Sequence, residues 1–197
     1  MTSIVTVVIP CAPHHEALVG RAIASVQQQT IPCDIIPYFD KEGRGAGYAR
    51  NAGARDCNTP CITFLDADDE LLPTFVADCL AAYEKGSFVY TPWEMGNGRV
   101  CYPDEKYPLL GEYIPHVTSL FPTEAFKALG GFDEDLPGDE DFDFLMRAVF
   151  HGLCPIYLNR PLFVYHKDGQ RSKDWLARPD ANGIHKMIYE RHGGKRT

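Results

Sequence analysis

Short apolar runs alternate with helix-like stretches along the first half of the chain, and this alternation limits the fold more than any other feature. Four runs of apolar, mostly β-branched or aromatic residues are typical of buried strands and lie at residues 4–9, 34–39, 62–65 and 88–91. Stretches with apolar residues at helical spacing separate them, at residues 14–29, 48–55 and 73–85. The repetition predicts an α/β fold in which a mostly parallel sheet, built by right-handed crossovers, is flanked by helices.

Prolines and glycines mark the ends of several expected elements. Pro10 is expected to stop the first strand, and Pro37 requires that the second strand be bulged or leave its N–H side unpaired. Regularity fades after residue 92, where a hairpin is expected at residues 96–98. A short helix is expected behind Thr123 as N-cap, and a longer one over residues 140–151. We therefore expect a single domain with a smaller second lobe.

Composition excludes several classes of protein. The 197 residues carry 27 acidic and 19 basic side chains, and the net charge of −8 disfavours non-specific binding to nucleic acid or anionic membrane. The seven cysteines form an odd count without a CxxC pair, which is typical of reduced thiols. Neither a signal peptide nor an apolar run of the ~20 residues that span a bilayer is present. We expect a cytoplasmic protein without stable membrane insertion.

Three carboxylates follow the third expected strand, within the stretch FLDADDELLP at residues 64–73. Asp66, Asp68 and Asp69 would repel one another unless a cation lay beside them, and such oxygen-rich sites suit Mg²⁺ or Mn²⁺. The alternative is a polar turn in which Asp69 caps the next helix. Ligands of open parallel sheets collect at the carboxyl ends of strands, so residues 10–12, Asp40 and residues 66–68 are expected to meet in one crevice.

A second acidic cluster, residues 139–141, begins the long helix expected in the second half. Acids in a first turn are favoured by the helix dipole alone, which is the alternative explanation. Asp141 shares a helical face with Phe144 and Leu145, however, so it can face the apolar interior near a cleft.

Six blocks, taken together, resemble those of the inverting family 2 glycosyltransferases, which have the GT-A (Rossmann-like) fold. They are VTVVIP at 5–10, GYARNAG at 47–53, FLDADD at 64–69, LGGFDE at 129–134, EDFDFLMR at 140–147 and VYH at 164–166. The family usually has a polar residue and an aromatic residue where this chain has Cys11 and Ala12. That difference, together with a reduced acidic turn at residues 39–42, leaves the nucleotide base open.

The resemblance implies transfer of a sugar from a nucleoside-diphosphate sugar, most often a UDP-sugar, to a hydroxyl acceptor, with Mn²⁺ or Mg²⁺ as cofactor. It divides the single domain 1–197 into a nucleotide-binding half (1–92), an acceptor and catalytic half (93–170), and a C-terminal flap and tail (171–197). In addition, residues 170–172 are expected to cover the diphosphate.

The resemblance also assigns residues. Asp141 would be the general base and Glu140 would lie beside it; the metal ligands would be Asp68 and His166. The residues implied for nucleotide binding are Pro10, Cys11, Asp40, Arg44, Arg50, Asp66 and Ala67. Those implied for the donor sugar and acceptor are Gly130, Gly131, Glu140 and Trp93. For several of them the sequence also leaves a structural role open: Asp40 as a turn residue, Arg50 on a helix surface, Gly130 as a helix C-cap and Trp93 in the core.

Two other functions stay open. A nucleotidyltransferase also uses acids and a metal, but it would carry a Gly-rich basic loop directly after the first strand, where this chain has CAPHH. A non-catalytic nucleotide-sugar-binding subunit would have no need of the Glu140–Asp141 pair. No motif names the acceptor, so a glycan, a lipid, a protein or a modified nucleic-acid base remains open, as does the oligomeric state.

Overall fold

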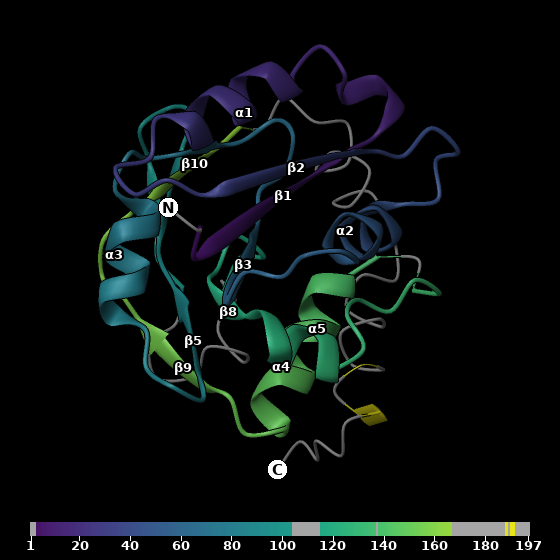
Figure 1. Cartoon of the computed structure of the whole chain (residues 1–197), viewed down its shortest axis with the longest axis vertical. Coiled ribbons are helices and arrows are strands. Elements are labelled where there is room, and N and C mark those ends of the chain that lie inside the picture. The colour runs from purple at the N-terminus through teal and green to yellow at the C-terminus, as the bar shows by residue number, and fades with distance from the viewer. Residues whose placement is uncertain (1–2, 104–114, 137, 167–187, 189, 192–197) are drawn as a thin grey trace.

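The computed structural model describes residues 3–103, 115–136, 138–166, 188 and 190–191 of the chain. Its central sheet has the strand order β2-β1-β3-β8 (Figure 1). The strands are β1 (Val5–Cys11), β2 (Asp34–Phe39), β3 (Cys61–Phe64) and β8 (Phe121–Pro122). β2 and β3 each pair in parallel with β1, and β8 runs antiparallel to β3. The mostly parallel sheet expected from the alternating pattern is therefore present.

The fourth expected strand is displaced from that sheet. β5 (Ser87–Tyr90) pairs in parallel with β9 (Cys154–Tyr157), and it meets the segment before β8 through a single bridge between Val89 and Leu120. Residues 88–91, expected in one parallel sheet with the first three strands, do not occupy the place beside β3. A two-residue antiparallel strand takes that place, and two residues carry no periodic signal that a sequence could reveal.

A second sheet has the order β4-β10-β6-β7. Its strands are β4 (Glu70–Leu71), β10 (Phe163–Tyr165), β6 (Trp93–Met95) and β7 (Val100–Cys101). The hairpin expected at residues 96–98 is confirmed as the antiparallel β6–β7 turn, in which Gly98 has a φ of 83°. Because β4 pairs with β10, the chain that leaves the carboxylates after β3 lies directly beside the strand that precedes His166.

Helices cover both faces of the central sheet (Figure 1). α1 (Val19–Gln27) and α3 (Phe75–Ala82) pack with Val5, Val7 and Ile9 of β1. The other face is covered by α2 (Ala46–Ala54), α4 (Thr123–Ala128) and α5 (Glu140–Phe150), which pack with Val8 and with Ile62 and Phe64 of β3. Alternate residues of a strand point to opposite faces, so both faces of β1 and β3 are buried, as their continuous apolar runs predict.

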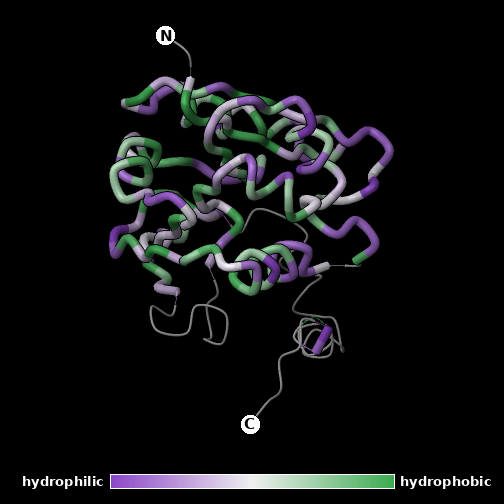
Figure 2. Tube along the Cα trace, turned by 60° about the horizontal axis from the view of Figure 1, so that its bottom comes forward, coloured by the Kyte–Doolittle hydropathy of each residue, from purple (hydrophilic) through white to green (hydrophobic). Residues whose placement is uncertain are grey.

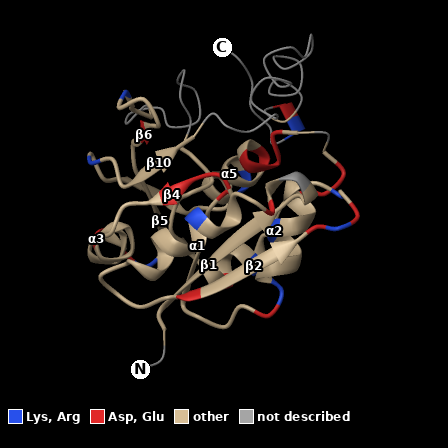
Figure 3. Ribbon diagram, turned by 90° about the horizontal axis from the view of Figure 1, so that it is seen from above, with Lys and Arg blue, Asp and Glu red and all other residues tan. Residues whose placement is uncertain are grey.

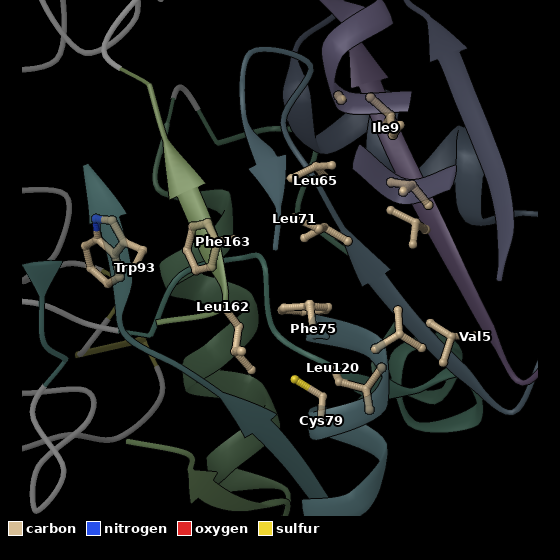
Figure 4. Close-up of a cluster of buried hydrophobic side chains, with 14 of the residues drawn as sticks. Val5, Ile9, Leu65, Leu71, Phe75, Cys79, Trp93, Leu120, Leu162 and Phe163 are labelled. Atoms are coloured by element: carbon tan, nitrogen blue, oxygen red, sulfur yellow. The ribbon is translucent and has the colours of Figure 1, made fainter. Parts of the chain in front are cut away.

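The core on the α1–α3 face continues into the second sheet. Figure 4 shows Val5 and Ile9 of β1 on one side, Phe75 and Cys79 of α3 in the centre, and Trp93 and Phe163 of the second sheet on the other side. These side chains belong to one buried cluster. In Figure 2 hydrophilic segments lie mainly in outer loops of the trace. No described helix combines the length and apolar character needed to cross a bilayer.

Two prolines occupy places that their missing N–H groups explain. Pro10 lies within β1, so the expectation that it stops the strand was wrong. On the β3 side, the carbonyl of Val8 accepts a hydrogen bond from the Leu65 N–H. Pro10 lies two residues further along the strand, so its nitrogen points to the same side. There it lies beyond Phe64, the last residue of β3 that pairs with β1. Pro37 lies in β2, an edge strand of its sheet, as a strand proline requires.

Helix boundaries differ from the expected ones by a few residues, as is usual. The stretch 14–29 contains a 3₁₀ turn, η1 (Pro13–His15), before α1 begins at Val19. Thr123 is the first residue of α4 instead of its cap. Asp69 does not cap α3 because β4 intervenes and Thr74 occupies the N-cap position. The acidic stretch after β3 is therefore not explained by helix capping.

Candidate functional site

The carboxylates after β3 lie at the carboxyl edge of the central sheet. Asp66 is partly exposed, whereas Ala67, Asp68 and Asp69 are buried. Burial and the neighbouring Asp66 raise the pKa of Asp68, and they raise the pKa of Asp69 well above its ordinary value. The main chain of Asp68 also accepts a hydrogen bond from Arg21 of α1. Three acids are thus held together where protein groups only partly offset their charge.

Arg50 of α2 joins this edge to α5. Its side chain is 3% exposed; one terminal nitrogen donates to Asp66 Oδ1 at 2.7 Å and the other to Glu140 Oε1 at 2.7 Å. Burial alone would lower the pKa of Arg50, but Asp66, Glu140 and Asp141 raise it, so the guanidinium stays charged. The surface-helix alternative for Arg50 is therefore wrong.

The acidic start of α5 faces the same region. Glu140 is buried, and the partly exposed Asp141 accepts a hydrogen bond from the Phe142 N–H at 2.8 Å. Desolvation by the surrounding protein, together with the charge of Glu140, raises the pKa of Asp141 to about 6, against the opposing effect of Arg50. Figure 3 shows the acidic residues at β4 and at the start of α5, in red. A carboxylate with this pKa is suited to accept a proton near neutral pH.

Two histidines lie near the carboxylates, and they are held differently. His166 is the histidine implied as a metal ligand. Its Nε2 forms a hydrogen bond of 2.8 Å with Glu70 Oε1, and its main-chain N–H donates to Asp69 Oδ1 at 2.8 Å. His116 lies with Asp66 and Asp69, one potential ligand atom of each falling within 4.8 Å of the others. Burial lowers the pKa of His116 to about 4, so its imidazole is neutral at pH 7.

The donor set after β3 fits a divalent cation. Asp69 is fully buried, and its Oδ2 has no hydrogen-bond partner among the described residues. An orphaned buried carboxylate oxygen is costly unless a cation or proton satisfies it. Carboxylate oxygens with one imidazole are ligands that suit Mn²⁺, and carboxylates alone suit Mg²⁺. Neither Asp68 nor His166 belongs to the described group of clustered ligand atoms, and their assignment as ligands stays a prediction.

The loop after β2 holds the residues implied for the nucleotide base. Asp40 is buried; its Oδ2 accepts from the Gly45 N–H at 2.9 Å, while Oδ1 is buried and finds no hydrogen-bond partner in the described part of the chain. Arg44 lies over the ring of Tyr48, with its guanidinium carbon 3.6 Å from the ring centroid. Asp40 thus fixes the Gly-rich loop, which explains its burial, and one oxygen remains for a donor. Pro10 and Cys11 end β1 beside this loop, since the Cys11 carbonyl accepts from the Asp40 N–H.

Gly130 and Gly131 follow α4 with φ values of 80° and 70°, so the C-cap role left open by the sequence is present. A Cβ on Gly131 would lie 2.4 Å from Asn51 Oδ1. Asn51 accepts from the Phe132 N–H at 2.9 Å and donates to the Phe132 carbonyl at 2.8 Å, which fastens this turn to α2. The close approach at Gly131 is therefore to Asn51, and its assignment to the donor sugar stays a prediction.

Trp93 and the C-terminal flap complete the expected site residues. Trp93 is 8% exposed and stacks on Phe163, with ring centroids 6.0 Å apart, so it packs in the core, the alternative that the sequence left open. Residues 170–172, expected to cover the diphosphate, lie outside the described residues.

Sequence reasoning missed one member of the candidate site, His116, and gave Asp69 no ligand role. Asp69 was set aside as a helix cap, although it belongs to the same acidic run as its neighbours. His116 is a single histidine in an irregular stretch, and no spacing to other ligand residues marks it. To find His116, one would have needed the β3–β8 pairing, because that pairing brings the segment before β8 beside the carboxylates.

Comparison with known proteins agrees with this fold. The family model "Glycosyl transferase family 2" matches residues 20–100. The pre-mycofactocin glycosyltransferase of Mycobacterium tuberculosis is 26% identical over 166 residues, which cover 74% of this chain and 35% of that protein. An uncharacterized glycosyltransferase of Haemophilus influenzae is 28% identical over 152 residues, covering 69% of this chain and 51% of that protein. The chain thus spans about a third to a half of the length of these relatives.

Solved structures share the fold. Staphylococcus aureus TarS 1–349, in complex with UDP-GlcNAc, superposes with a TM-score of 0.76 and 18% identity over 93% of this chain and 65% of that one. The mannosyltransferase PcManGT of Pyrobaculum calidifontis, in complex with GDP-Man and Mn²⁺, gives a TM-score of 0.73 and 17% identity over 100% of this chain and 66% of that one. Both are glycosyltransferases of the GT-A fold. With the matching family model and the curated relatives, this likeness leads to one conclusion: the chain has the GT-A fold, and its residues 20–100 match the model of glycosyl transferase family 2.

Proposed function

We propose that this chain is an inverting, metal-dependent glycosyltransferase that transfers a sugar from a nucleoside-diphosphate sugar to an acceptor hydroxyl. The observation that carries the proposal is the Arg50 bridge, because its two 2.7 Å hydrogen bonds unite the carboxylates after β3 with the acidic start of α5. A site of this kind uses two groups of acids. One group would hold a cation that binds the phosphates of the donor, and the other would accept the proton that the acceptor hydroxyl loses.

The residues at the strand edge would hold the donor. Asp66 and Asp69 would hold Mn²⁺ or Mg²⁺ together with Asp68, which is the ligand that the resemblance implies. A bound divalent cation neutralises the charge that develops on a departing diphosphate. Arg50 fixes the position of Asp66 and keeps a positive charge beside it. The structures with UDP-GlcNAc and GDP-Man support a nucleotide-sugar donor, and we propose a UDP-sugar.

The residues of α5 would act on the acceptor. In one displacement, the acceptor oxygen attacks the anomeric carbon, the bond from that carbon to the diphosphate oxygen breaks, and the nucleoside diphosphate leaves with the electron pair. Asp141 accepts the proton that the acceptor hydroxyl loses, and attack from the opposite face inverts the anomeric configuration. A base with a pKa of about 6 is mostly ionised at pH 7 while it remains basic enough for this step. Glu140, fixed by Arg50, would bind the acceptor or the sugar.

The test is the Asp141→Asn variant with a UDP-sugar and Mn²⁺. We expect binding of the nucleotide to stay within about twofold, while kcat falls by at least ~10²-fold, the low end for a lost general base. In the unchanged protein, kcat/KM should fall at acid pH, with a midpoint near the pKa of about 6, and the residual rate of the variant should lack this limb. Normal turnover by the variant would remove Asp141 as base. A chain that binds nucleotide-sugars without releasing nucleotide would be a binding subunit.

A further inference from the structure

Polar residues recur at every fourth position along α1 and just beyond its C-terminus. Arg21, Ser25 and Gln29, here called the α1 row, lie outside the six blocks that resemble the family. Residues four apart share a face of a helix, and the row lies beside Ala22 and Val26, which pack in the core. Ser25 and Gln29 are buried. Because buried polar side chains are rarely left without hydrogen-bond partners, the partners of this row are informative.

The first two side chains of the α1 row bind the main chain at the carboxylates and directly after them. Arg21 donates to the Asp68 carbonyl. Ser25 Oγ accepts from the Leu71 N–H at 3.0 Å and donates to the Ala22 carbonyl at 2.7 Å. The serine hydroxyl thus uses its proton within α1 and offers a lone pair to β4.

Gln29 continues these contacts toward α3. Its Nε2 donates to the Leu72 carbonyl at 2.8 Å, and its Oε1 accepts from the Val76 N–H at 3.0 Å. Val76 lies in the first turn of α3, where N–H groups have no acceptor within the helix. Gln29 therefore acts as a cap for α3 from outside that helix.

The strand β10 binds the same segment from the opposite side, so that β4 lies between α1 and β10 (Figure 3). Successive N–H groups of an extended chain point in opposite directions. The Leu71 N–H accordingly reaches Ser25, while the Leu72 N–H donates to the Leu162 carbonyl, next to β10, at 2.8 Å. The chain that leaves Asp69 is therefore fixed on both sides, and on one of them it depends on α1.

We propose that Ser25 and Gln29 are positioning residues for the donor, because they fix the main chain that directly follows the carboxylates. The inference rests on the proposed function, in which Asp68 and Asp69 help to hold a cation and the donor diphosphate. Small displacements of such groups are costly, since a shift of about 1 Å can lower a rate ~10²-fold. The proposed base lies on α5, which covers the other face of the central sheet. Loss of either side chain should therefore weaken donor binding and spare proton transfer.

Two substitutions remove these hydrogen bonds and change the side-chain volume little. Ser25→Ala takes away one oxygen, and Gln29→Met keeps the length of the side chain without its amide. Gln27→Met is the matched control, because it makes the same chemical change at an exposed position of α1. Val26→Ala is the control for stability, since it leaves a cavity under the same helix and changes no polar group of the row. Ser25→Ala also serves if Gln29→Met does not fold.

Calorimetric titration with Mn²⁺ and inorganic pyrophosphate measures binding, and steady-state turnover of a UDP-sugar separates KM from kcat. We expect Ser25→Ala and Gln29→Met each to weaken pyrophosphate binding by about 10-fold, the low end for loss of a group that orients metal ligands. KM for the donor should rise by a similar factor, while kcat stays within about twofold and the acid limb assigned to Asp141 keeps its midpoint. Gln27→Met should change none of these quantities. Val26→Ala should lower the midpoint of urea unfolding and leave binding and turnover unchanged.

Unchanged binding and KM in both Ser25→Ala and Gln29→Met would overturn the inference and leave the proposed glycosyl transfer intact. An equal loss of binding in Val26→Ala would also overturn it, because general destabilisation would then explain the effect. A fall in kcat at constant KM would do the same. If the unchanged protein does not bind pyrophosphate with Mn²⁺, both this inference and the metal dependence in the proposed function are wrong. The Asp141→Asn test of the proposed base is independent of all these results.

Discussion

Arg50 and Glu140 lie 90 positions apart in the sequence, and a hydrogen bond of 2.7 Å joins their side chains. Because the second terminal nitrogen of Arg50 holds Asp66, one buried cation connects α2, the carboxyl end of β3 and the start of α5. The guanidinium has the planar, forked shape that two separate carboxylates require, and a lysine could not reproduce it. The position of the proposed base relative to the proposed metal site therefore depends on Arg50.

Removal of Arg50 should cost more than a surface substitution. Arg50→Met leaves Asp66 and Glu140 without their shared cation, and loss of one partner from a buried ion pair costs about 3–5 kcal/mol. Urea unfolding at pH 7 measures this, with Arg55→Met as control, because Arg55 is the exposed C-cap residue of the same helix. Adding Glu140→Gln to Arg50→Met should recover ~1 kcal/mol or more, as coupled neighbours do. An Arg50→Met protein as stable as Arg55→Met would contradict the bridge.

Asp141 should make the stability of the fold depend on pH. Its pKa is about 6 in the folded protein against 3.8 ordinarily, so between these values the folded state binds more protons than the unfolded state. The free energy of unfolding therefore falls as pH rises through this window, and the loss is complete above pH 6. Asp141→Asn, which is always neutral, should be more stable at pH 7.5 by on the order of 1–3 kcal/mol.

The gain from Asp141→Asn should shrink as pH falls and vanish below about pH 4, where the carboxyl is protonated in both states. Chemical unfolding at pH 4, 6 and 7.5 follows it. Asp135→Asn is the control, because Asp135 is exposed in the turn before α5 and should show no such dependence. A gain of equal size at all three pH values would mean that packing, and not ionisation, separates Asn from Asp at position 141.

The repeating part of the fold was predictable, and the non-repeating part was not. β1, β2, β3 and the helices after them follow apolar periodicities long enough to be recognised in the sequence. β8 has two residues and β4 has two, and each forms only through pairing with a strand distant in sequence. Those short strands decide where β5 lies, why Asp69 does not cap α3 and how His116 reaches the carboxylates. Tertiary pairing of this kind leaves no local signal.

The candidate site divides in the same way. Asp66, Glu140 and Asp141 were found because acids gathered at the ends of regular elements, where a sheet edge and a helix start limit what they can face. For Arg50 the sequence offered a functional and a surface role, and only its contacts with residues 16 and 90 positions away decide between them. The ring orientations of His116 and His166 depend on Thr118 and Glu70, and no sequence pattern connects these pairs.

Two adjacent glycines give a matched test of the turn that follows α4. Gly130 and Gly131 both have positive φ, which costs an alanine about 1–2 kcal/mol. At Gly130 a Cβ would meet no atom of the described residues within 4 Å, whereas at Gly131 it would lie 2.4 Å from Asn51 Oδ1. Gly130→Ala should therefore show only the backbone cost, and Gly131→Ala should lose about 3 kcal/mol or more.

Thermal and urea unfolding compare the two variants. Asn51→Ala removes the clashing atom, so in that background the extra loss from Gly131→Ala should disappear and the two glycines should behave alike. Asn51→Ala alone should also destabilise, since it breaks the reciprocal hydrogen bonds with Phe132. Equal losses from Gly130→Ala and Gly131→Ala in the unchanged protein would show that the contact with Asn51 does not limit this turn.

The packing of α2 on β1 makes Gly53 a further position where a methyl group should not fit. A Cβ there would lie 2.6 Å from Val8 Cγ1, in a buried layer with no flexible side chain to yield. Gly53→Ala should destabilise by about 1–3 kcal/mol, the usual cost of overpacking. Gly20 of α1 is the control: it is exposed and helical, and a Cβ there would lie more than 4 Å from every atom that the structure describes around it. Gly20→Ala should stabilise by up to about 1 kcal/mol, because alanine favours the helix.

Opposite signs for the two substitutions in urea unfolding would follow from packing alone, since helix propensity favours both. Stabilisation by Gly53→Ala would mean that α2 can move away from β1 without loss, and Arg50 would then not be held in place by that contact.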